Sequence, residues 1–570
     1  MLSLFGLLVF IADFGFEQNT LLQGFFNGYY FVVLTFGIFA TLMKYVAREK
    51  SLSLKVLAFD TLSLLFIVGV ILFHFYSKKS GGERPLFYDD NWLKFAILLT
   101  FIREVSAQNL NYTRLFLNPA QLFIASFFVV ILLGSFLLLL PNASHSGISF
   151  LDALFTSASA VCVTGLIVVD TGSYFTLFGQ AIICLLIQVG GLGILTFASY
   201  FSYFFRGGAT YENQLVLSDI TNSQKIGEVF SVLQRILAIT FSIEIVGAAF
   251  IYFSVDRALF DTEFDHLFFS VFHAVSAFCN AGFSTLPNSL YESGFRYNYA
   301  LQIVVICLFV LGGLGFPIVV NLLKYLKYLI LGPILQLKSG KKQHRPWVLN
   351  LNSRITLITT LSLTLIGTVF FYFSEYDNTL AEHSGFGKIV TAWFGASTPR
   401  TAGFNTVDMS ALHVSTLIIV FFLMWIGASP ASTGGGIKTS TFAIAVLNFI
   451  SIAKGKARIE VYRREIAAIS VRRAFATIVL SLIVIGLGVF FLSISDREKD
   501  LLSIAFETVS AYSTVGLSVG ITGSLSPMGK WVIIAIMFIG RVGMLSILIA
   551  IFKKVKHKNY QYPTEEILIN

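Results

Sequence analysis

Four twelve-residue segments of this chain align without gaps: FTSASAVCVTGL (155–166), FHAVSAFCNAGF (272–283), WFGASTPRTAGF (393–404) and FETVSAYSTVGL (506–517). Each segment opens with an aromatic residue and has serine at its fifth position. The eleventh position is always glycine, at nearly constant spacing along the chain: Gly165, Gly282, Gly403 and Gly516. Such a pattern indicates an internal repeat, in which each copy is one structural unit that packs against its neighbours.

Apolar stretches flank every segment. Eight of them approach or reach the roughly 20 residues that a helix needs to cross a bilayer: 120–140, 177–199, 230–253, 300–320, 355–373, 412–426, 477–492 and 531–551. The second stretch of each repeat also carries a small-residue motif: QVGGLG (188–193), VLGGLG (310–315), WIGASPASTGGG (425–436) and FIGRVG (538–543). We therefore expect an all-α polytopic membrane protein in which four helix–pore loop–helix units surround one pore.

The repeats divide the chain into five predicted parts. Residues 1–117 are expected to form extra N-terminal membrane helices, because apolar runs occupy 29–43, 56–76 and 92–102. The other parts are pore repeat 1 (118–207), pore repeat 2 (208–331), pore repeat 3 with an intramembrane loop (332–453) and pore repeat 4 with a cytoplasmic tail (454–570). An even number of crossings per repeat keeps all four pore loops on the external side.

Composition and charge indicate a bilayer environment. Of the 570 residues, 56% are hydrophobic and 12% are charged, whereas soluble domains carry about 25% charged residues. The net charge of +9 is concentrated, since 324–354 and 454–473 hold seven basic residues each and the connections between them hold few. Basic loops face the cytoplasm in multi-pass proteins. The charge therefore reflects topology, and we expect the lipid bilayer, not nucleic acid, as the partner.

The glycine of each pore loop favours a cation pathway. The stretch before it is apolar but too short to span, and non-helical backbone at membrane depth occurs only where it is buried or lines a water-filled cavity. Glycine allows backbone conformations, including positive φ, that aim carbonyls at an axis, and rings of carbonyls can replace the hydration shell of a cation. The short helices would point their negative C-terminal ends at the same axis.

Purely structural roles for the glycines and the serines remain open at this point. The glycines could serve only close helix packing, as in small-xxx-small motifs. The four shared serines could either bond to the backbone of the filter or act as small packing residues: Ser159, Ser276, Ser397 and Ser510.

These motifs resemble those of the Trk/Ktr/HKT superfamily of potassium transporters, and in particular its bacterial KtrB- and TrkH-type membrane subunits. VTGL (163–166), NAGF (280–283), TAGF (401–404) and TVGL (514–517) are similar to the four filter sequences of that superfamily. IGASPASTGGGIKTST (426–441) is similar to its third-repeat intramembrane loop, and FIGRVGML (538–545) to its fourth-repeat arginine motif. The resemblance covers about 118–555, and the N-terminus before it is longer than that of KtrB-type subunits.

The resemblance implies potassium uptake across the plasma (inner) membrane through a gated selectivity filter. The implied filter residues are Val163, Thr164, Gly165, Asn280, Ala281, Gly282, Thr401, Ala402, Gly403, Thr514, Val515 and Gly516. Potassium is then the transported substrate, held by filter carbonyls, and this chain is expected to need no cofactor. Glycine in the first filter accompanies potassium selectivity in the superfamily, and serine there accompanies sodium selectivity. The resemblance also implies a homodimer and a cytoplasmic nucleotide-binding regulatory subunit of the RCK/KTN type.

The third outgoing stretch is interrupted by GASPASTGGGIKTS (427–440), whose four glycines, one proline and five hydroxyls are incompatible with a regular helix. The run GGGIKTS lacks the lysine that directly follows the last glycine of a phosphate-binding loop. We expect the segment to gate the pore below the filter. The candidate gate residues are Gly427, Ser429, Ser432, Thr433, Gly434, Gly435, Gly436 and Lys438. The alternative is a kink or loop without a gating role.

Arg541 lies in the middle of an apolar stretch, between Gly540 and Gly543. An ionisable residue inside a membrane is costly and marks a functional site by default. We expect it to contact the 427–440 loop and to belong to the gate, although an arginine that only fixes helix ends is the alternative. Glu244, in another apolar stretch, is expected to make a structural pair or hydrogen bond.

Two alternative functions agree less well with the sequence. A sodium- or proton-coupled potassium symporter is the first alternative, but the sequence has no obvious line of intramembrane carboxylates for a proton relay. A membrane-embedded enzyme or the ion-binding subunit of a potassium pump is the second. No metal-ligand cluster, Ser/His/Asp grouping or phosphate loop is recognisable in the sequence, so we do not expect an enzyme.

Overall fold

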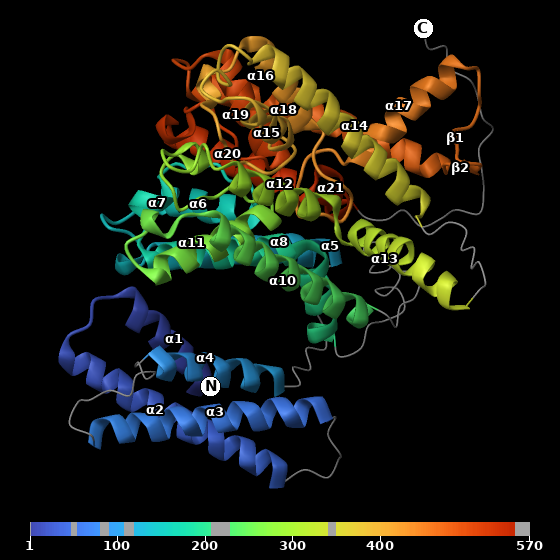
Figure 1. Ribbon diagram of the computed structural model, residues 1–570. Coiled ribbons are helices and arrows are strands. Elements are labelled where there is room, and N and C mark those ends of the chain that lie inside the picture. Colours follow the sequence, from blue (N-terminus) through green and yellow to red (C-terminus); the bar gives the residue numbers. More distant parts are fainter. Residues whose placement is uncertain are drawn as a thin grey trace.

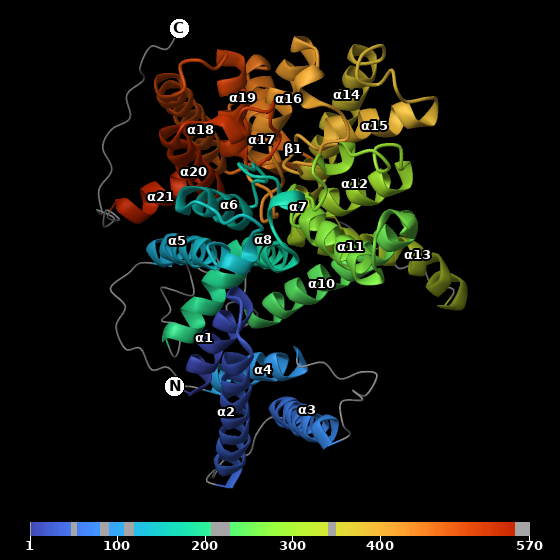
Figure 2. The same ribbon diagram turned by 90° about the vertical axis from the view of Figure 1, so that its left-hand side faces the viewer.

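The computed structural model describes residues 2–46, 54–79, 91–107, 119–206, 229–339 and 349–552, and its regular structure is almost entirely helical. The predicted all-α architecture is therefore confirmed. Figures 1 and 2 show that the four N-terminal helices lie together at one end, while the remaining helices form a larger body.

The N-terminal part consists of α1 (Leu2–Gly15), α2 (Thr20–Val46), α3 (Leu54–Lys79) and α4 (Asn91–Ala107). These helices share a buried apolar cluster that includes Tyr30. Beside it, Asp13 accepts a hydrogen bond from the Tyr30 hydroxyl at 2.9 Å and pairs with Lys94 Nζ at 3.1 Å. This part contacts the larger body near the end of α1, where Asn142 Nδ2 donates to the Phe14 carbonyl at 3.0 Å.

Each predicted repeat folds as an incoming helix, a short pore helix and an outgoing helix. Repeat 1 has α5 (Pro119–Leu138), η1 (Pro141–Ala143), α6 (Phe150–Cys162), α7 (Thr171–Tyr174) and α8 (Leu177–Arg206). Repeat 2 has α10 (Val229–Ser254), η3 (Arg257–Leu259), α11 (Glu263–Phe278), η4 (Ser289–Tyr291), α12 (Tyr299–Leu314) and α13 (Phe316–Ser339). The helix α13 runs past the boundary predicted at residue 331, and the boundaries stay a prediction.

The second half of the chain repeats the plan. Repeat 3 has α14 (Leu351–Ser374), α15 (Phe386–Ser397), η5 (Met409–Ala411), α16 (Val414–Trp425) and α17 (Thr439–Ala453). Repeat 4 has α18 (Ala468–Ser495), α19 (Leu501–Ser513), η6 (Thr522–Ser524), α20 (Pro527–Val542) and α21 (Met544–Ile551). Between α17 and α18, two strands of two residues each, β1 (Glu460–Val461) and β2 (Arg464–Glu465), form a hairpin that pairs Glu460 with Glu465.

The outgoing helices of repeats 2 and 4, which cover the apolar stretches 300–320 and 531–551, are broken. The chain bends by 110° between α12 and α13 and by 84° between α20 and α21. Both bends lie at a glycine with positive φ, 79° at Gly315 and 83° at Gly543. A Cβ on Gly315 would lie 2.7 Å from the Pro430 carbonyl oxygen. The break in repeat 2 therefore makes room for the loop of repeat 3.

The pore helices begin at side-chain caps. The hydroxyls of Ser149 and Thr262 accept the backbone N–H of the third residue beyond them, and Asp500 caps α19 in a similar way. A side chain that accepts one of the free N–H groups at a helix start stabilises that start. Residues adjacent in the sequence thus determine where α6, α11 and α19 begin, whereas α15 begins after Gly385 without a side-chain cap.

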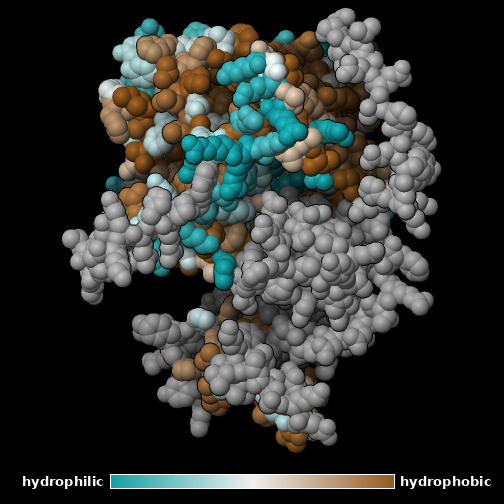
Figure 3. Space-filling view, turned by 90° about the vertical axis from the view of Figure 1, so that its right-hand side faces the viewer, coloured by the Kyte–Doolittle hydropathy of each residue, from teal (hydrophilic) through white to brown (hydrophobic). Residues whose placement is uncertain are grey.

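The long helices present apolar side chains to the outside. Exposed residues of α14 and α18 include Leu361, Phe373, Leu482 and Phe490. Four helices within the described ranges are long and apolar enough to cross a membrane, or up to six if each bent pair is one span. Figure 3 shows broad hydrophobic areas on the side of the larger body where α17 and the hairpin lie in Figure 1, with hydrophilic residues gathered across them. These surfaces are those of a multi-pass membrane protein.

Candidate ion pathway

The backbone of the four glycine segments departs from ordinary geometry in the same way in each repeat. The glycines have φ of 91°, 71°, 79° and 89°, in the order Gly165, Gly282, Gly403 and Gly516. The residue two positions earlier also has positive φ in every repeat: Val163 (56°), Asn280 (60°), Thr401 (75°) and Thr514 (50°). Residues other than glycine rarely adopt this region. Since valine, asparagine and threonine all adopt the same geometry here, the backbone path itself is what the repeats share.

The four segments close into a ring. A Cβ on Gly165 would overlap the carbonyl oxygen of Ala281, so repeat 1 contacts repeat 2. The other three contacts continue the circle: Gly282 meets Ala402, Gly403 meets Val515, and Gly516 meets Thr164 of repeat 1. In each contact the nearby backbone includes the carbonyl oxygen that precedes the neighbouring glycine. We call 163–165, 280–282, 401–403 and 514–516 the glycine ring; it contains all twelve residues predicted for the filter.

The shared serines bond to the backbone around the ring in three repeats. In repeats 1 and 4 the glycine N–H donates to the serine hydroxyl, from Gly165 to Ser159 and from Gly516 to Ser510, at 3.1 Å each. In repeat 2 the Ser276 hydroxyl instead donates to the carbonyl oxygen of Phe283, the residue after the glycine, at 2.7 Å. Hydrogen bonding, not packing alone, accounts for these three serines.

Repeat 3 departs from this scheme. Ser397 Oγ has no hydrogen-bond partner within the described residues, and the next residue takes over, since Thr398 Oγ1 donates to the Phe404 carbonyl at 2.6 Å. The residue before this part of the ring is Arg400, whose guanidinium turns to α14 and donates to the Thr360 carbonyl at 3.2 Å. Sequence reasoning missed Arg400; a lone charge inside a repeated apolar segment was the available signal.

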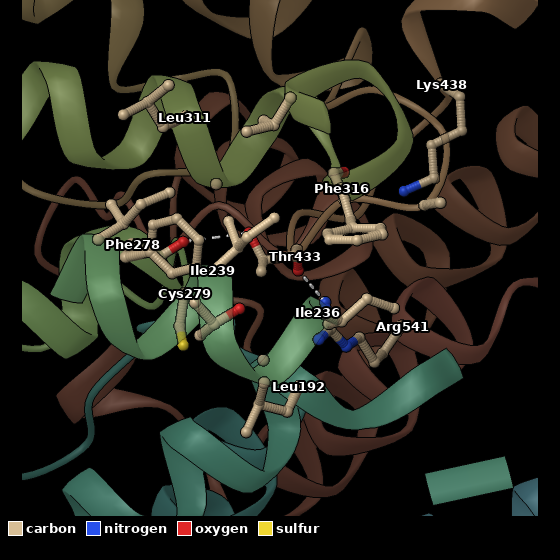
Figure 4. A pocket seen from close by; sticks show the side chains of 17 residues that line it. Leu192, Ile236, Ile239, Phe278, Cys279, Leu311, Phe316, Thr433, Lys438 and Arg541 are labelled. Carbon is tan, nitrogen blue, oxygen red and sulfur yellow. Dashed lines mark hydrogen bonds between the residues drawn. The ribbon is translucent and has the colours of Figure 1, made fainter. Parts of the chain in front are cut away.

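Two cavities lie near the ring. One, of about 340 Å³, is lined by all four ring glycines and by residues that follow them, including Asp170 and Asp408. The other, of about 230 Å³, is lined by Cys279 at the end of α11, by Thr433 of the 427–440 loop and by Arg541. Figure 4 shows the second cavity, with side chains from repeats 1, 2 and 4 and from the loop around it. The ring glycines thus line the first, outer cavity, whereas the second, inner cavity is bounded by the loop and Arg541 and not by the ring itself.

The 427–440 loop lies directly against the inner side of the ring. A Cβ on Gly434 would overlap Thr401 Oγ1, and one on Gly435 would overlap Thr514 Oγ1. These two glycines are required because no side chain fits between the loop and the ring. Across the same space, Thr433 Oγ1 donates to Asn280 Oδ1 at 2.9 Å.

Further contacts hold the loop to its own chain and to repeat 2. The Ser429 N–H donates to the Gly313 carbonyl at 2.9 Å, and the Ser432 hydroxyl to the Ser429 carbonyl at 2.6 Å. Lys438 Nζ donates to the Gly434 carbonyl at 2.6 Å, so this cation is held by its own loop. Gly427 and Gly436 pack on each other, with a Cβ on Gly436 3.0 Å from Gly427 Cα. All the predicted gate residues of the loop thus lie in one compact segment.

Arg541 connects three repeats. Its guanidinium donates to the Thr433 carbonyl of the loop and to the Gly190 carbonyl of α8, and Figure 4 shows the first of these bonds. The residue is 4% exposed, and its Nε has no hydrogen-bond partner in the described part of the chain. The predicted contact with the loop is present. Glu244, expected to be structural, accepts hydrogen bonds from Gln188 Nε2 at 3.1 Å.

The chain matches known proteins over most of its length. The TrkH family, described as cation transport protein, matches residues 91–562. The Ktr system potassium uptake protein B of Bacillus subtilis is 36% identical over 452 residues, which cover 79% of this chain and 96% of that protein. The potassium/sodium uptake protein NtpJ of Enterococcus hirae is 35% identical over 464 residues, which cover 80% of this chain and 97% of that protein.

A solved structure supports the fold. The crystal structure of the potassium transporter TrkH from Vibrio parahaemolyticus superposes with a TM-score of 0.60 at 16% identity, covering 92% of this chain and 97% of that one. Together with the match over 91–562, which exceeds half of the chain, these findings assign the chain to a family of transporters, not of enzymes. The chain belongs to the TrkH family of cation transport proteins.

Proposed function

We propose that this protein takes up potassium across the plasma membrane, down its electrochemical gradient, through a gated pore whose selectivity filter is the glycine ring. The observation that carries the proposal is the ring itself: four backbone segments with the same unusual φ pattern, closed on one another, with all four glycines lining one cavity. Two relatives are named as potassium uptake proteins, which supports potassium as the substrate.

The chemistry of the ring suits a dehydrated monovalent cation. Carbonyl oxygens from four directions can replace water around an ion, and no side chain fits at the glycine positions. The pore helices α6, α11, α15 and α19 end just before the ring, and a helix C-terminus carries a partial negative charge. Both effects favour a cation and disfavour an anion.

We further propose that the 427–440 loop and Arg541 form the gate. The loop occupies the space below the ring, where it touches Thr401 and Thr514. A guanidinium remains charged at any physiological pH, so Arg541 opposes a cation in the inner cavity while it holds the loop at Thr433. Opening requires the loop to leave the ring. The alternative, a structural loop and arginine, predicts that their removal impairs folding without raising flux.

The assembly we propose is a homodimer, with one pore in each protomer, that binds a cytoplasmic nucleotide-binding regulator of the RCK/KTN type. Relatives named as proteins of a Ktr system support a multi-component assembly. The basic residues of 454–473, such as Arg463 and Arg472, are exposed and follow α17 directly, so they offer a surface linked to the loop. We propose the basic segment 324–345 as a second docking surface; it lies partly outside the described residues.

Ion flux into proteoliposomes tests the proposal. The purified protein should take up potassium without an added sodium or proton gradient, whereas a coupled symporter would need one. The variant Gly165→Ser should lower the potassium-to-sodium uptake ratio by roughly 5–150-fold, because strain and displaced carbonyls at a filter position cost about 1–3 kcal/mol. An unchanged ratio in a well-folded variant would contradict the filter assignment.

A further inference from the structure

The second position of the twelve-residue repeat is polar in three copies and differs in all four: Thr156, His273, Phe394 and Glu507. In the structure these residues lie in the pore helices behind the ring. His273 and Glu507, in repeats 2 and 4, are completely buried, although charged or titratable side chains are rarely buried without a partner. Neither residue belongs to the filter or the gate proposed above.

Glu507 holds the chain that leaves the ring in repeat 4. Its carboxylate accepts the hydroxyl of Ser518, two residues after the ring glycine, and the hydroxyl of Thr522 at 2.9 Å. Ser518 Oγ also accepts the Gly520 N–H at 2.9 Å. One buried carboxylate thus fixes the turn from 518 to 522, and this turn lines the outer cavity.

His273 does the same in repeat 2. Its Nδ1 lies 2.9 Å from the Phe269 carbonyl, which can only accept, so Nδ1 carries the hydrogen. In the neutral ring Nε2 is then an acceptor, and Ser284, two residues after Gly282, donates to it at 2.9 Å. Ser284 Oγ in turn accepts the Leu286 N–H at 3.0 Å. His273 and Glu507 occupy equivalent positions in their repeats, and each accepts a hydrogen bond from the serine two residues after its ring glycine.

Repeats 1 and 3 lack this arrangement. In repeat 1 the residue two after the glycine is Ile167, and Thr156 Oγ1 is buried without a hydrogen-bond partner among the described residues. In repeat 3 the equivalent pore-helix residue is Phe394, and Asn405 Nδ2 donates to the Val407 carbonyl at 3.5 Å. We call each of these hydrogen bonds, Glu507 with Ser518 and His273 with Ser284, a brace. Because the ring runs through repeats 1, 2, 3 and 4 in order, the two repeats with a brace lie across the axis from each other.

We propose that Glu507 and His273 are positioning residues for ion selection, which act through Ser518 and Ser284 to fix the outer edge of the ring in two opposite quadrants. The proposal rests on the glycine ring being the filter. Each serine is oriented by one acceptor and one donor, so the carbonyls just before it are held at a fixed distance from the axis. Loss of a brace should loosen the outer edge, and a looser ring accepts the smaller sodium ion.

Single hydroxyl deletions test the braces. Ser518→Ala and Ser284→Ala should each lower the potassium-to-sodium uptake ratio in proteoliposomes by roughly two- to tenfold, the effect of losing one net hydrogen bond. The double variant should lower it further than either single variant. Ser518→Thr, which keeps the hydroxyl at a half-exposed position, should retain the native ratio. The matched control is Thr156→Val, which removes a buried hydroxyl that has no hydrogen-bond partner in the described part of the chain and should leave the ratio unchanged.

The outcomes separate the brace from the filter. If Gly165→Ser lowers the potassium-to-sodium uptake ratio while both serine variants behave like Thr156→Val, the positioning role of Glu507 and His273 is rejected and the filter assignment is retained. If Gly165→Ser also leaves the ratio unchanged, the filter assignment fails. If the serine variants reduce thermal stability but keep the native ratio, the two residues only support folding, and the positioning role is overturned.

Discussion

The glycine ring and the loop below it are built on opposite plans. Every repeat contributes the same backbone path to the ring, with positive φ at the same two positions. The loop comes from repeat 3 alone, and it is held by different groups of its neighbours: Asn280 and Gly313 of repeat 2 and Arg541 of repeat 4. An ion on the axis is best surrounded equally from all sides, but a segment that moves aside does not need equivalent contacts to every repeat. In the function proposed above, the symmetric ring selects the ion and the asymmetric loop gates the pore.

Removing the loop should distinguish most clearly between the role of the loop in gating and the role of the ring in ion selection. Deletion of 429–435 takes away the segment that contacts Thr401 and Thr514 but leaves the ring glycines in place. Basal potassium flux without the regulator should rise by roughly tenfold or more, equal to about 1.4 kcal/mol of lost closed-state stabilisation, with an unchanged potassium-to-sodium ratio. Flux into proteoliposomes measures both. Reduced flux in a normally folded variant would mean that the loop supports the open pore.

Arg541 tests the attachment itself. Arg541→Ala frees two buried carbonyls, at Thr433 and Gly190, and should raise basal flux while costing about 1–3 kcal/mol for each unsatisfied group. The matched variant Arg541→Lys keeps the charge but loses the two-pronged donor geometry, so its basal flux should be intermediate. Equal flux for both variants and the native protein would remove Arg541 from the gate.

A smaller change should loosen the contact between loop and ring. Gly435→Ala places a methyl group against Thr514, which should push the loop away and raise basal flux by less than the deletion does. The control is Gly486→Ala in α18, where an added Cβ meets nothing within 4 Å. Both variants are compared for basal flux and thermal stability. If Gly435→Ala behaves like the control, the loop does not close against the ring.

The smallest expected effect on the pore comes from the basic segment 454–473, which is predicted to face the cytoplasm. Reversing Arg463, Arg472 and Arg473 to glutamate should weaken binding of an acidic regulator, since complementary charge chiefly steers association, while basal flux and selectivity stay native. Arg497→Glu, in the exposed connection predicted to be external, is the matched control. Binding is measured by co-purification and regulation by flux. Intact insertion together with intact regulation would exclude this docking surface.

Much of the site was readable in the sequence because it is repeated. The glycine at the eleventh position recurs four times, and only a shared backbone requirement gives four unrelated side-chain contexts the same glycine. The contact between Arg541 and the loop could be predicted because a charge in an apolar stretch needs buried partners. The serines could not be assigned, since whether Ser159 accepts a hydrogen bond and Ser276 donates one depends on the distance to neighbouring backbone.

The sequence by itself determined the helical class, the four units, the capped starts of α6, α11 and α19 and the positions that must be glycine, because these follow from local propensity and from chain geometry within one repeat. Only the tertiary structure decided the bends at Gly315 and Gly543 and the pairing of Glu507 and His273 with serines beyond the ring. An apolar stretch looks the same whether it is straight or bent, since its composition records burial and not direction. Bends and partners arise when segments far apart in the chain compete for the same space around one axis.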